Sequence, residues 1–108
     1  MNVFELQQTA DEVSSLMKVL SNRNRLLLLC QLVEGEKSVG ELAILLGLRE
    51  QAVSQQLGLL RRDGLVGNRR DGQSIYYKLD RPDVLKLMEF LYNTYCGPDG
   101  SSDERAEK

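Results

Sequence analysis

The sequence of 108 residues contains no histidine. Imidazole is the usual base of catalytic dyads and triads and a common ligand of zinc and copper, so its absence removes both kinds of site. A closed zinc site would have to be built from two thiolates and carboxylates, which is a poor ligand set. We therefore expect no enzymatic activity, no bound metal and no cofactor, although a soft ion such as As(III) or Cd(II) bridging thiolates stays open.

Cysteine is also scarce, and the two residues, Cys30 and Cys96, are far apart in the sequence. They do not form the Cys-x-x-Cys motif of a thiol oxidoreductase. The sequence also has no signal-peptide pattern and no apolar run long enough to span a bilayer. Two cysteines without a secretory context are typical of a reducing cytoplasm. We expect a cytoplasmic protein that does not enter a membrane and in which a disulfide forms only transiently.

The chain as a whole lacks the positive charge of a nucleic-acid-binding protein, because its net charge is −2. From Arg49 to Lys78, however, six basic side chains stand against three acidic ones, which gives this segment a net charge of +3. Local rather than total charge decides whether a surface can contact phosphate. The positive charge of the chain is therefore concentrated in this segment.

A helix-turn-helix pattern begins before this segment and extends into its first part. A short helix is predicted over 39–46, with Ser38 as its N-cap and Glu41 as the capping-box partner, and Gly47 ends it. A second helix is predicted over 48–62 with a polar outer face. Its buried stripe consists of Val53, Leu57 and Leu60. Two short helices in this arrangement are typical of proteins that enter the major groove of DNA.

A β-hairpin is predicted directly after these helices. Asp71-Gly72 separates two candidate strands at 65–70 and 73–79, which is a strong hairpin signal. In the second strand, Ile75, Tyr77 and Leu79 alternate with more polar residues and indicate one inward face. A helix-turn-helix followed by a hairpin is a winged helix.

The polar residues of this unit are the candidate DNA contacts. On the second helix, the base-reading candidates are Gln51, Ser54 and Gln55, because amide and hydroxyl groups can pair with base edges. Gln56 is a weaker candidate because it lies nearer the helix seam. Residues expected to contact phosphate or the minor groove are Arg61, Arg69, Arg70 and Gln73. The alternative is that all of these polar groups only face solvent.

Three further helices complete the expected fold, which is mainly α with a small β-hairpin in the order helix, helix, helix, helix, strand, strand, helix. An amphipathic helix is predicted over 3–20, an almost wholly apolar central helix over 22–33, and a last helix from Pro82 to about Cys96, with Asp80 a candidate N-cap. The first and last helices carry more apolar surface than a small domain covers, so they are candidates for a homodimer interface. Residues 1–97 are expected to form one domain, and residues 98–108 a disordered tail.

Five motifs taken together resemble the ArsR family of dimeric winged-helix repressors over residues 16–97. They are Leu20-Ser-Asn-Arg-Asn-Arg-Leu26, Ser38-Val-Gly-Glu-Leu42, Ala52-Val-Ser-Gln-Gln-Leu57, Leu59-Leu-Arg-Arg-Asp-Gly-Leu-Val66 and Gln73-Ser-Ile-Tyr-Tyr-Lys-Leu79. The resemblance implies a homodimer that binds double-stranded operator DNA and represses transcription.

The contexts of both cysteines are similar to the BigR/SqrR group of this family, which responds to sulfide and persulfide. Spacing alone favours two independent packing cysteines, since free cysteine is often buried. The resemblance instead implies that Cys30 and Cys96 sense persulfide or polysulfide. One thiolate would attack a sulfur electrophile, and the other would close a disulfide or polysulfide bridge that releases DNA. Arg23 and Arg25 are candidates for lowering a thiol pKa.

Other readings stay open. Metal-sensing members of the family carry Cys-x-Cys in the segment that corresponds to 40–45, or histidines in the last helix, and this chain has neither. HlyU-type regulators are close relatives in sequence, which leaves a redox-responsive regulator or a counter-silencer as an alternative. Heme or a soft metal could also be the inducer. A winged helix used only for protein contact and a dithiol enzyme are the remaining classes.

Overall fold

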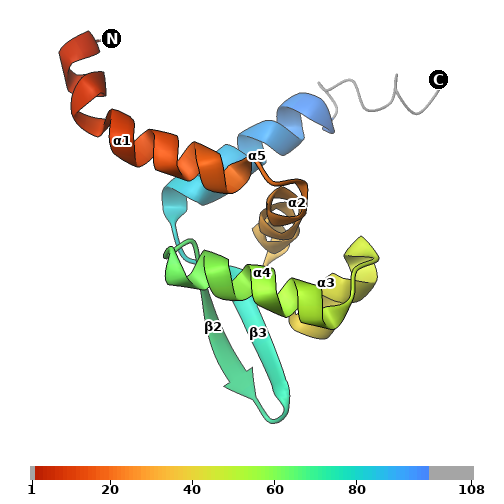
Figure 1. The fold of residues 1–108 in the computed structure, drawn as a ribbon. Coiled ribbons are helices and arrows are strands. Elements are labelled where there is room, and N and C mark those ends of the chain that lie inside the picture. Colours follow the sequence, from red (N-terminus) through yellow and green to blue (C-terminus); the bar gives the residue numbers. More distant parts are fainter. Residues whose placement is uncertain (1, 98–108) are drawn as a thin grey trace.

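A computed structural model describes residues 2–97 of the chain, so the expected disordered tail at 98–108 lies outside the described residues. The helices are α1 (Val3–Leu20), α2 (Arg23–Gln31), the 3-10 turn η1 (Leu32–Glu34), α3 (Val39–Leu46), α4 (Glu50–Arg62) and α5 (Pro82–Tyr95). The strands are β1 (Lys37–Ser38), β2 (Val66–Asp71) and β3 (Ser74–Leu79). This is the predicted winged helix, and its hairpin extends away from the helices (Figure 1).

The helix-turn-helix is held by the local signals that the sequence predicts. At the start of α3, the Ser38 hydroxyl accepts from the backbone N–H of Glu41 at 3.1 Å, and the Glu41 carboxylate accepts from the backbone N–H of Ser38 at 2.8 Å. Gly47 ends α3 with a φ of 66°, in the left-handed region that glycine adopts without strain. The capping box and this turn together fix where α4 starts.

The wing is part of a three-stranded antiparallel sheet with the order β1-β3-β2. Asp71 pairs with Ser74, so Gly72 and Gln73 form the two-residue loop, and Gly72 has a φ of 66°. Glycine at the first loop position is typical of the tight turns that join twisted antiparallel strands. The sequence did not predict β1, because two residues are too few for an alternating pattern.

Several predicted helix ends differ from the structure; helix α4, for example, begins at Glu50 and not at residue 48. The apolar run of α2 stops being α-helical at Gln31 and continues as a 3-10 turn up to Gly35, whose φ is 136°. The expectation that Asp80 caps α5 was wrong. Arg81 occupies the N-cap without a side-chain hydrogen bond, and the carboxylate of Asp83 accepts from the backbone N–H of Val84 at 2.9 Å instead.

Helix α2 is the centre of the core, since it packs against α1, α3, α4 and α5. Leu28 and Leu29 on this helix are completely buried. The predicted stripe of α4 is also completely buried, and so are one residue of α3 and two residues of α5. These residues are Val53, Leu57 and Leu60 on α4, Leu42 on α3, and Val84 and Met88 on α5. The core therefore joins the helix-turn-helix to α5 through a single helix.

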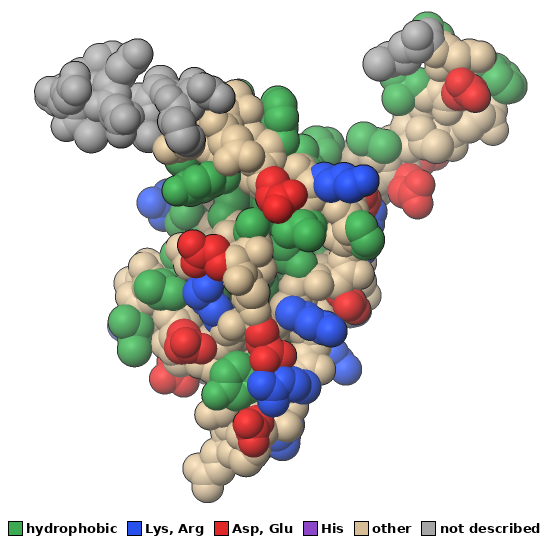
Figure 2. All heavy atoms as spheres, turned by 180° about the vertical axis from the view of Figure 1, so that it is seen from behind, with side chains coloured by type: hydrophobic (Ala, Val, Ile, Leu, Met, Phe, Trp, Pro, Cys, Tyr) green, Lys and Arg blue, Asp and Glu red, His purple; other side chains and the backbone are tan. Residues whose placement is uncertain are grey.

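Helices α1 and α5 leave large hydrophobic side chains exposed. Helix α1 has no buried residue, and it reaches beyond the body of the molecule (Figure 1). The exposed residues are Val3, Phe4, Leu6, Val13 and Met17 on α1, and Phe90, Tyr92 and Tyr95 on α5. Figure 2 shows hydrophobic side chains over the upper part of the molecule and mixed acidic and basic side chains over the hairpin below. Among the described helices, none has the length and hydropathy that crossing a bilayer requires.

We expect Leu57→Ala to lower the free energy of unfolding by about 2–5 kcal/mol, because it removes a completely buried side chain and leaves a cavity against α2. Urea unfolding followed by circular dichroism measures the change. Leu45→Ala on α3 is the matched control, since that leucine is 53% exposed and its loss should cost less than about 1 kcal/mol. Equal losses for the two variants would contradict the assigned core.

Candidate nucleic-acid interface and thiol pair

Helix α4 turns one polar face to solvent. Gln51, Ser54 and Gln55 are all exposed, on the side opposite the buried stripe of the helix. Within residues 2–97, none of these three side chains is hydrogen-bonded to another part of the protein. Their amide and hydroxyl groups are therefore available to a ligand, and a base edge is a ligand that such groups can read.

Gln56 lies differently from its neighbour Gln55. It is half-buried, and its side-chain oxygen accepts from Nη1 of Arg25 at 3.4 Å. This contact places Gln56 at the seam between α2 and α4, as the sequence predicted, and its rank as a candidate for base contact stays a prediction.

Gly58 is a residue of this face that the sequence analysis missed. It is exposed in the middle of α4, and a Cβ atom built on it would meet nothing within 4 Å. Glycine inside a helix costs about 0.5–1 kcal/mol relative to alanine, and no contact in the described structure requires it. The available signal was the isolated glycine within an amphipathic pattern. Its missing side chain leaves the backbone of α4 open to close approach.

The last turn of α4 is basic. Arg61 and Arg62 are exposed and line a shallow hollow of about 530 Å³ between α4 and the start of β2. Asn68 and Asp80 line the same hollow, so its charge is mixed rather than purely positive.

Arg69 lies apart from the other predicted contacts because its guanidinium is already engaged. It reaches over the ring of Tyr76, 4.7 Å from the centroid, and donates two hydrogen bonds to Glu36 at 2.7 and 2.8 Å. These hydrogen bonds lower the pKa of Glu36 and raise the pKa of Arg69, so both groups stay charged near neutral pH. The contact spans the sheet, because Glu36 precedes β1 and Arg69 is on β2. Arg69 therefore ties the wing to the body.

Arg70 is on the other face of the hairpin, since successive residues of a strand alternate. It pairs with Ile75, whose side chain packs against the core, so Arg70 is on the face of the sheet that meets the helices. Arg70 is exposed, as is Gln73 in the loop, and no hydrogen bond or ion pair engages either side chain within the described chain. Of the two wing arginines, Arg70 is the one whose charge is available.

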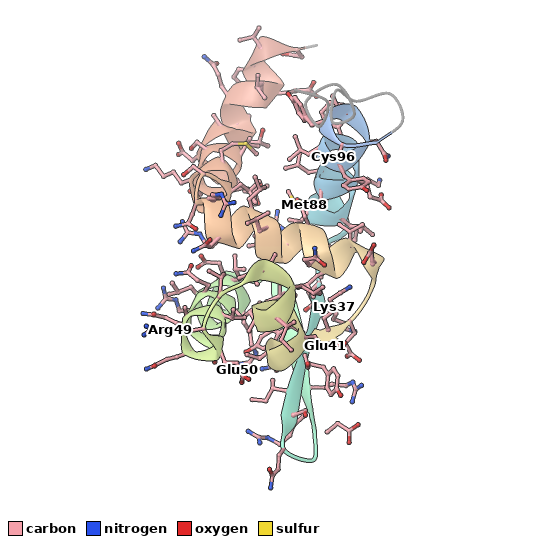
Figure 3. The ribbon with its side chains drawn as sticks, turned by 90° about the vertical axis from the view of Figure 1, so that its right-hand side faces the viewer. Lys37, Glu41, Arg49, Glu50, Met88 and Cys96 are labelled. Atoms are coloured by element: carbon pink, nitrogen blue, oxygen red, sulfur yellow. The ribbon has the colours of Figure 1, made fainter. Side chains whose placement is uncertain are left out.

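The two cysteines come from helices that pack together. Cys30 is half-buried on α2, and its Sγ donates to Sδ of the buried Met88 on α5 at 3.7 Å. Cys96 is exposed and directly follows the last residue of α5 (Figure 3). Burial raises the pKa of Cys30, and the charge of the Cys96 thiolate raises the pKa further. The structure thus brings the two thiols within reach of mutual electrostatic interaction.

The prediction that a nearby arginine lowers a thiol pKa was wrong for Cys30, since its pKa is raised. Arg25 points elsewhere: its Nε donates to the backbone oxygen of Val19 at 2.8 Å, in the last turn of α1. Arg23, in the first turn of α2, is exposed.

Within residues 2–97, no three side chains of the types His, Cys, Asp or Glu gather closely enough to hold a metal ion. The chemistry considered for this pair is therefore that of the two thiols, of which Cys30 has the sulfur of Met88 as its neighbour.

Comparison with known proteins gives one family and close relatives. The family model described as "Bacterial regulatory protein, arsR family" matches residues 22–67. The "Transcriptional activator HlyU" of Vibrio cholerae is 41% identical over 96 residues, which cover 89% of each chain. A "Biofilm growth-associated repressor" of Agrobacterium fabrum is 43% identical, over 87% of this chain and 80% of that protein. The crystal structure of the transcriptional repressor BigR from Xylella fastidiosa superposes with a TM-score of 0.83 and 43% identity, covering 89% of this chain and 98% of that chain.

We expect Cys30 to be alkylated by iodoacetamide with a pH profile shifted to higher pH, because burial and the Cys96 thiolate both oppose its ionisation. In Cys96→Ser the neighbouring negative charge is removed, so the profile of Cys30 should move toward lower pH. Peptide mass spectrometry after timed alkylation between pH 6 and 10 measures the rates at Cys30. An unchanged profile in Cys96→Ser would mean that the two thiols do not interact.

Proposed function

The chain belongs to the arsR family of bacterial regulatory proteins, and we propose that it is a homodimeric repressor that releases operator DNA when Cys30 and Cys96 become joined through sulfur. Its relatives are transcriptional regulators, so it is a DNA-binding regulator and not an enzyme. One observation carries the proposal: Sγ of Cys30 on α2 lies 3.7 Å from Sδ of Met88 on α5, the helix that Cys96 directly follows. The signal that we propose is a persulfide or polysulfide.

The DNA-reading surface is proposed to be α4 together with the wing. Gln51, Ser54 and Gln55 would meet base edges in the major groove, with the backbone at Gly58 close to the DNA. The charged and polar groups proposed to hold phosphate or the minor groove are Arg61, Arg70 and Gln73. Arg69 is assigned a supporting role, since its ion pair with Glu36 fixes the wing.

A second copy of the chain is proposed to cover α1 and α5. Exposed aromatic and aliphatic side chains on both helices form an apolar surface that a monomer leaves in water, and burying such surface is the main driving force for association. A two-fold dimer also suits DNA reading, because its two recognition helices can enter half-sites about 34–36 Å apart.

The proposed chemistry begins at Cys96, which is exposed, whereas Cys30 is half-buried and bonded to Met88. The Cys96 thiolate attacks the outer sulfur of a persulfide RSSH, which gives Cys96–SSH and releases RS⁻. The Cys30 thiolate then attacks the inner sulfur of Cys96–SSH, which forms the Cys30–Cys96 disulfide and expels HS⁻. If a second RSSH first transfers its outer sulfur to Cys96–SSH, which gives Cys96–SSSH and releases RS⁻, the Cys30 thiolate attacks the middle sulfur instead, closes a trisulfide and expels HS⁻.

The geometry of α5 favours a bridge with extra sulfur. Cys30 touches α5 at Met88, which is eight residues before Cys96, or roughly 12 Å along a helix. A direct disulfide requires Cα atoms within about 7 Å, so it demands that the end of α5 moves toward α2. A longer sulfur chain needs a smaller movement, which makes sulfur donors better signals than peroxide.

A bridge would act on DNA binding through the dimer. Helix α2 also packs against α4, so drawing the end of α5 toward α2 changes the tilt of α5 in the dimer interface relative to the recognition helix. Because both half-sites must be met at once, a small change in tilt lowers affinity. The bridge is thus a covalent bias on a two-state dimer.

A second candidate is a regulator whose DNA binding raises transcription. The observation that favours it is the similarity to the "Transcriptional activator HlyU", which is 41% identical to this chain. The same operator binding would then displace a silencing protein instead of blocking polymerase. A reporter gene behind the operator separates the two, because loss of the regulator raises expression from a repressed promoter and lowers it from an activated one.

We expect Cys30→Ser and Cys96→Ser each to bind operator DNA with the affinity of the reduced wild type and to keep that affinity after persulfide treatment, since neither can close a bridge. The wild type should lose at least tenfold in affinity. Fluorescence anisotropy measures binding, and intact-mass spectrometry shows whether a bridge holds zero, one or more extra sulfurs. A full response in either serine variant would remove the dithiol switch. Peroxide treatment of the wild type is the control for general oxidation.

We expect Arg70→Ala to weaken binding to all DNA sequences and to reduce the slope of log K against log salt by about 1, because one phosphate contact is lost. Arg69→Ala is the matched control on the adjacent residue, and its slope should stay near that of the wild type, because Arg69 is paired with Glu36. Binding measured between 50 and 300 mM salt gives both slopes. A loss of slope confined to Arg69→Ala would reverse these roles.

A further inference from the structure

Arg25 joins three helices that have different tasks in the proposed function. It is on α2, its Nε donates to the backbone oxygen of Val19 at 2.8 Å, and its Nη1 donates to the side-chain oxygen of Gln56 at 3.4 Å. Val19 is in the last turn of α1, and Gln56 is in the middle of α4. One guanidinium therefore contacts the end of the proposed dimer helix and the proposed recognition helix together.

The contact with Val19 is short and lies where a cation is favoured, and the longer contact with Gln56 is partly shielded from water. The last carbonyl groups of a helix have no partner within it, and a cation at a helix C-terminus is favoured by the helix dipole, so Arg25 satisfies the end of α1 in two ways. Arg25 and Gln56 are each half-buried, which reduces competition from water. The forked guanidinium holds two acceptors in fixed directions, which the point charge of lysine does not.

Within the described residues, the hydrogen bond to Arg25 is the one contact that explains why a polar side chain stands at position 56. It lies in the seam beside the exposed reading face rather than on it, unlike Gln55. A hydrophobic residue in the seam would bury more apolar surface, yet the chain carries an amide whose oxygen bonds Arg25.

We propose that Arg25 and Gln56 form a clasp that sets the angle of the recognition helix relative to the dimer helix, and thereby the spacing at which the dimer reads two half-sites. Arg25 is a positioning residue, since it acts through Gln56 and α1 and not through a contact of its own with DNA. The inference rests on the proposed dimeric operator binding. It also assigns a route for the switch, because Cys30 is on the same helix five residues after Arg25.

The test uses the full-length protein and three DNA probes. A duplex enriched by the wild type from a random-sequence pool serves as the two-half-site probe; a second duplex has one half scrambled, and a third has one base pair inserted between the halves. Arg25→Lys keeps the charge at the end of α1 but loses the fork, and Gln56→Leu keeps the volume but loses the acceptor. Arg23→Lys is the matched control, since Arg23 is exposed on the same helix.

We expect Arg25→Lys and Gln56→Leu each to weaken binding of the two-half-site probe about tenfold and to bind the half-scrambled probe as the wild type does. The penalty of the inserted base pair should shrink in both variants. The double variant should lose no more than Arg25→Lys alone, since Gln56 is proposed to act only through Arg25. Arg23→Lys should match the wild type, and thermal unfolding confirms that each variant is folded.

Other results overturn the clasp. If Gln56→Leu weakens the half-scrambled probe equally or changes base preference, Gln56 reads bases as Gln55 is proposed to do. If both variants bind all three probes as the wild type does, the contact has no role in spacing. If the wild type itself prefers no two-half-site probe, the dimeric operator binding fails first, and this result is separate from any effect of the variants.

Discussion

The structure depends on the burial of one short helix against all the others. Helix α2 is nine residues long, and its leucines contact α1, α3, α4 and α5. Helices of this length are not stable alone in water, so α2 exists because its neighbours cover it. Helix α2 is in turn a packing partner that α4 and α5 share. A change on α2 therefore affects the packing of α5 and of α4, the helices proposed to carry the dimer surface and the DNA-reading surface.

This arrangement explains why polar side chains occur only at particular places around α2. Asn22 caps its start, Arg25 satisfies the end of α1, and Lys37 donates to the backbone oxygen of Gln31 at its end. Cys30, the next-to-last residue of α2, contacts the sulfur of Met88 in the middle of α5. A thiol can occupy such a site because it packs like a small hydrophobe and still reacts when a sulfur electrophile arrives.

The sequence predicted those parts of the fold that local signals determine. The capping box at Ser38, the turn at Gly47 and the buried stripe of α4 are each set by a few neighbouring residues, and all were confirmed. The pairing of Glu36 with Arg69 was not predictable, because it joins residues 33 apart in the sequence and Glu36 precedes an edge strand of only two residues. The same reason applies to Arg25, since adjacency in sequence suggested an effect on Cys30, whereas the fold directs its side chain to α1 and α4. Long-range side-chain partners follow from packing, which a single sequence does not display.

The two arginines of the wing also differ because of long-range partners that the sequence does not display. Arg69 and Arg70 are adjacent residues of the same type, but because side chains alternate along β2 they lie on opposite faces of the sheet. Arg69 contacts Glu36, whereas Arg70 faces solvent. An ion pair on an exposed surface contributes little to stability, but a bidentate pair packed over Tyr76 restricts how far the hairpin can swing. A hairpin with a fixed angle presents Arg70 and the loop at a defined distance from α4. Specific DNA reading needs this rigidity as much as it needs charge, because the wing and the helix must reach the same duplex together.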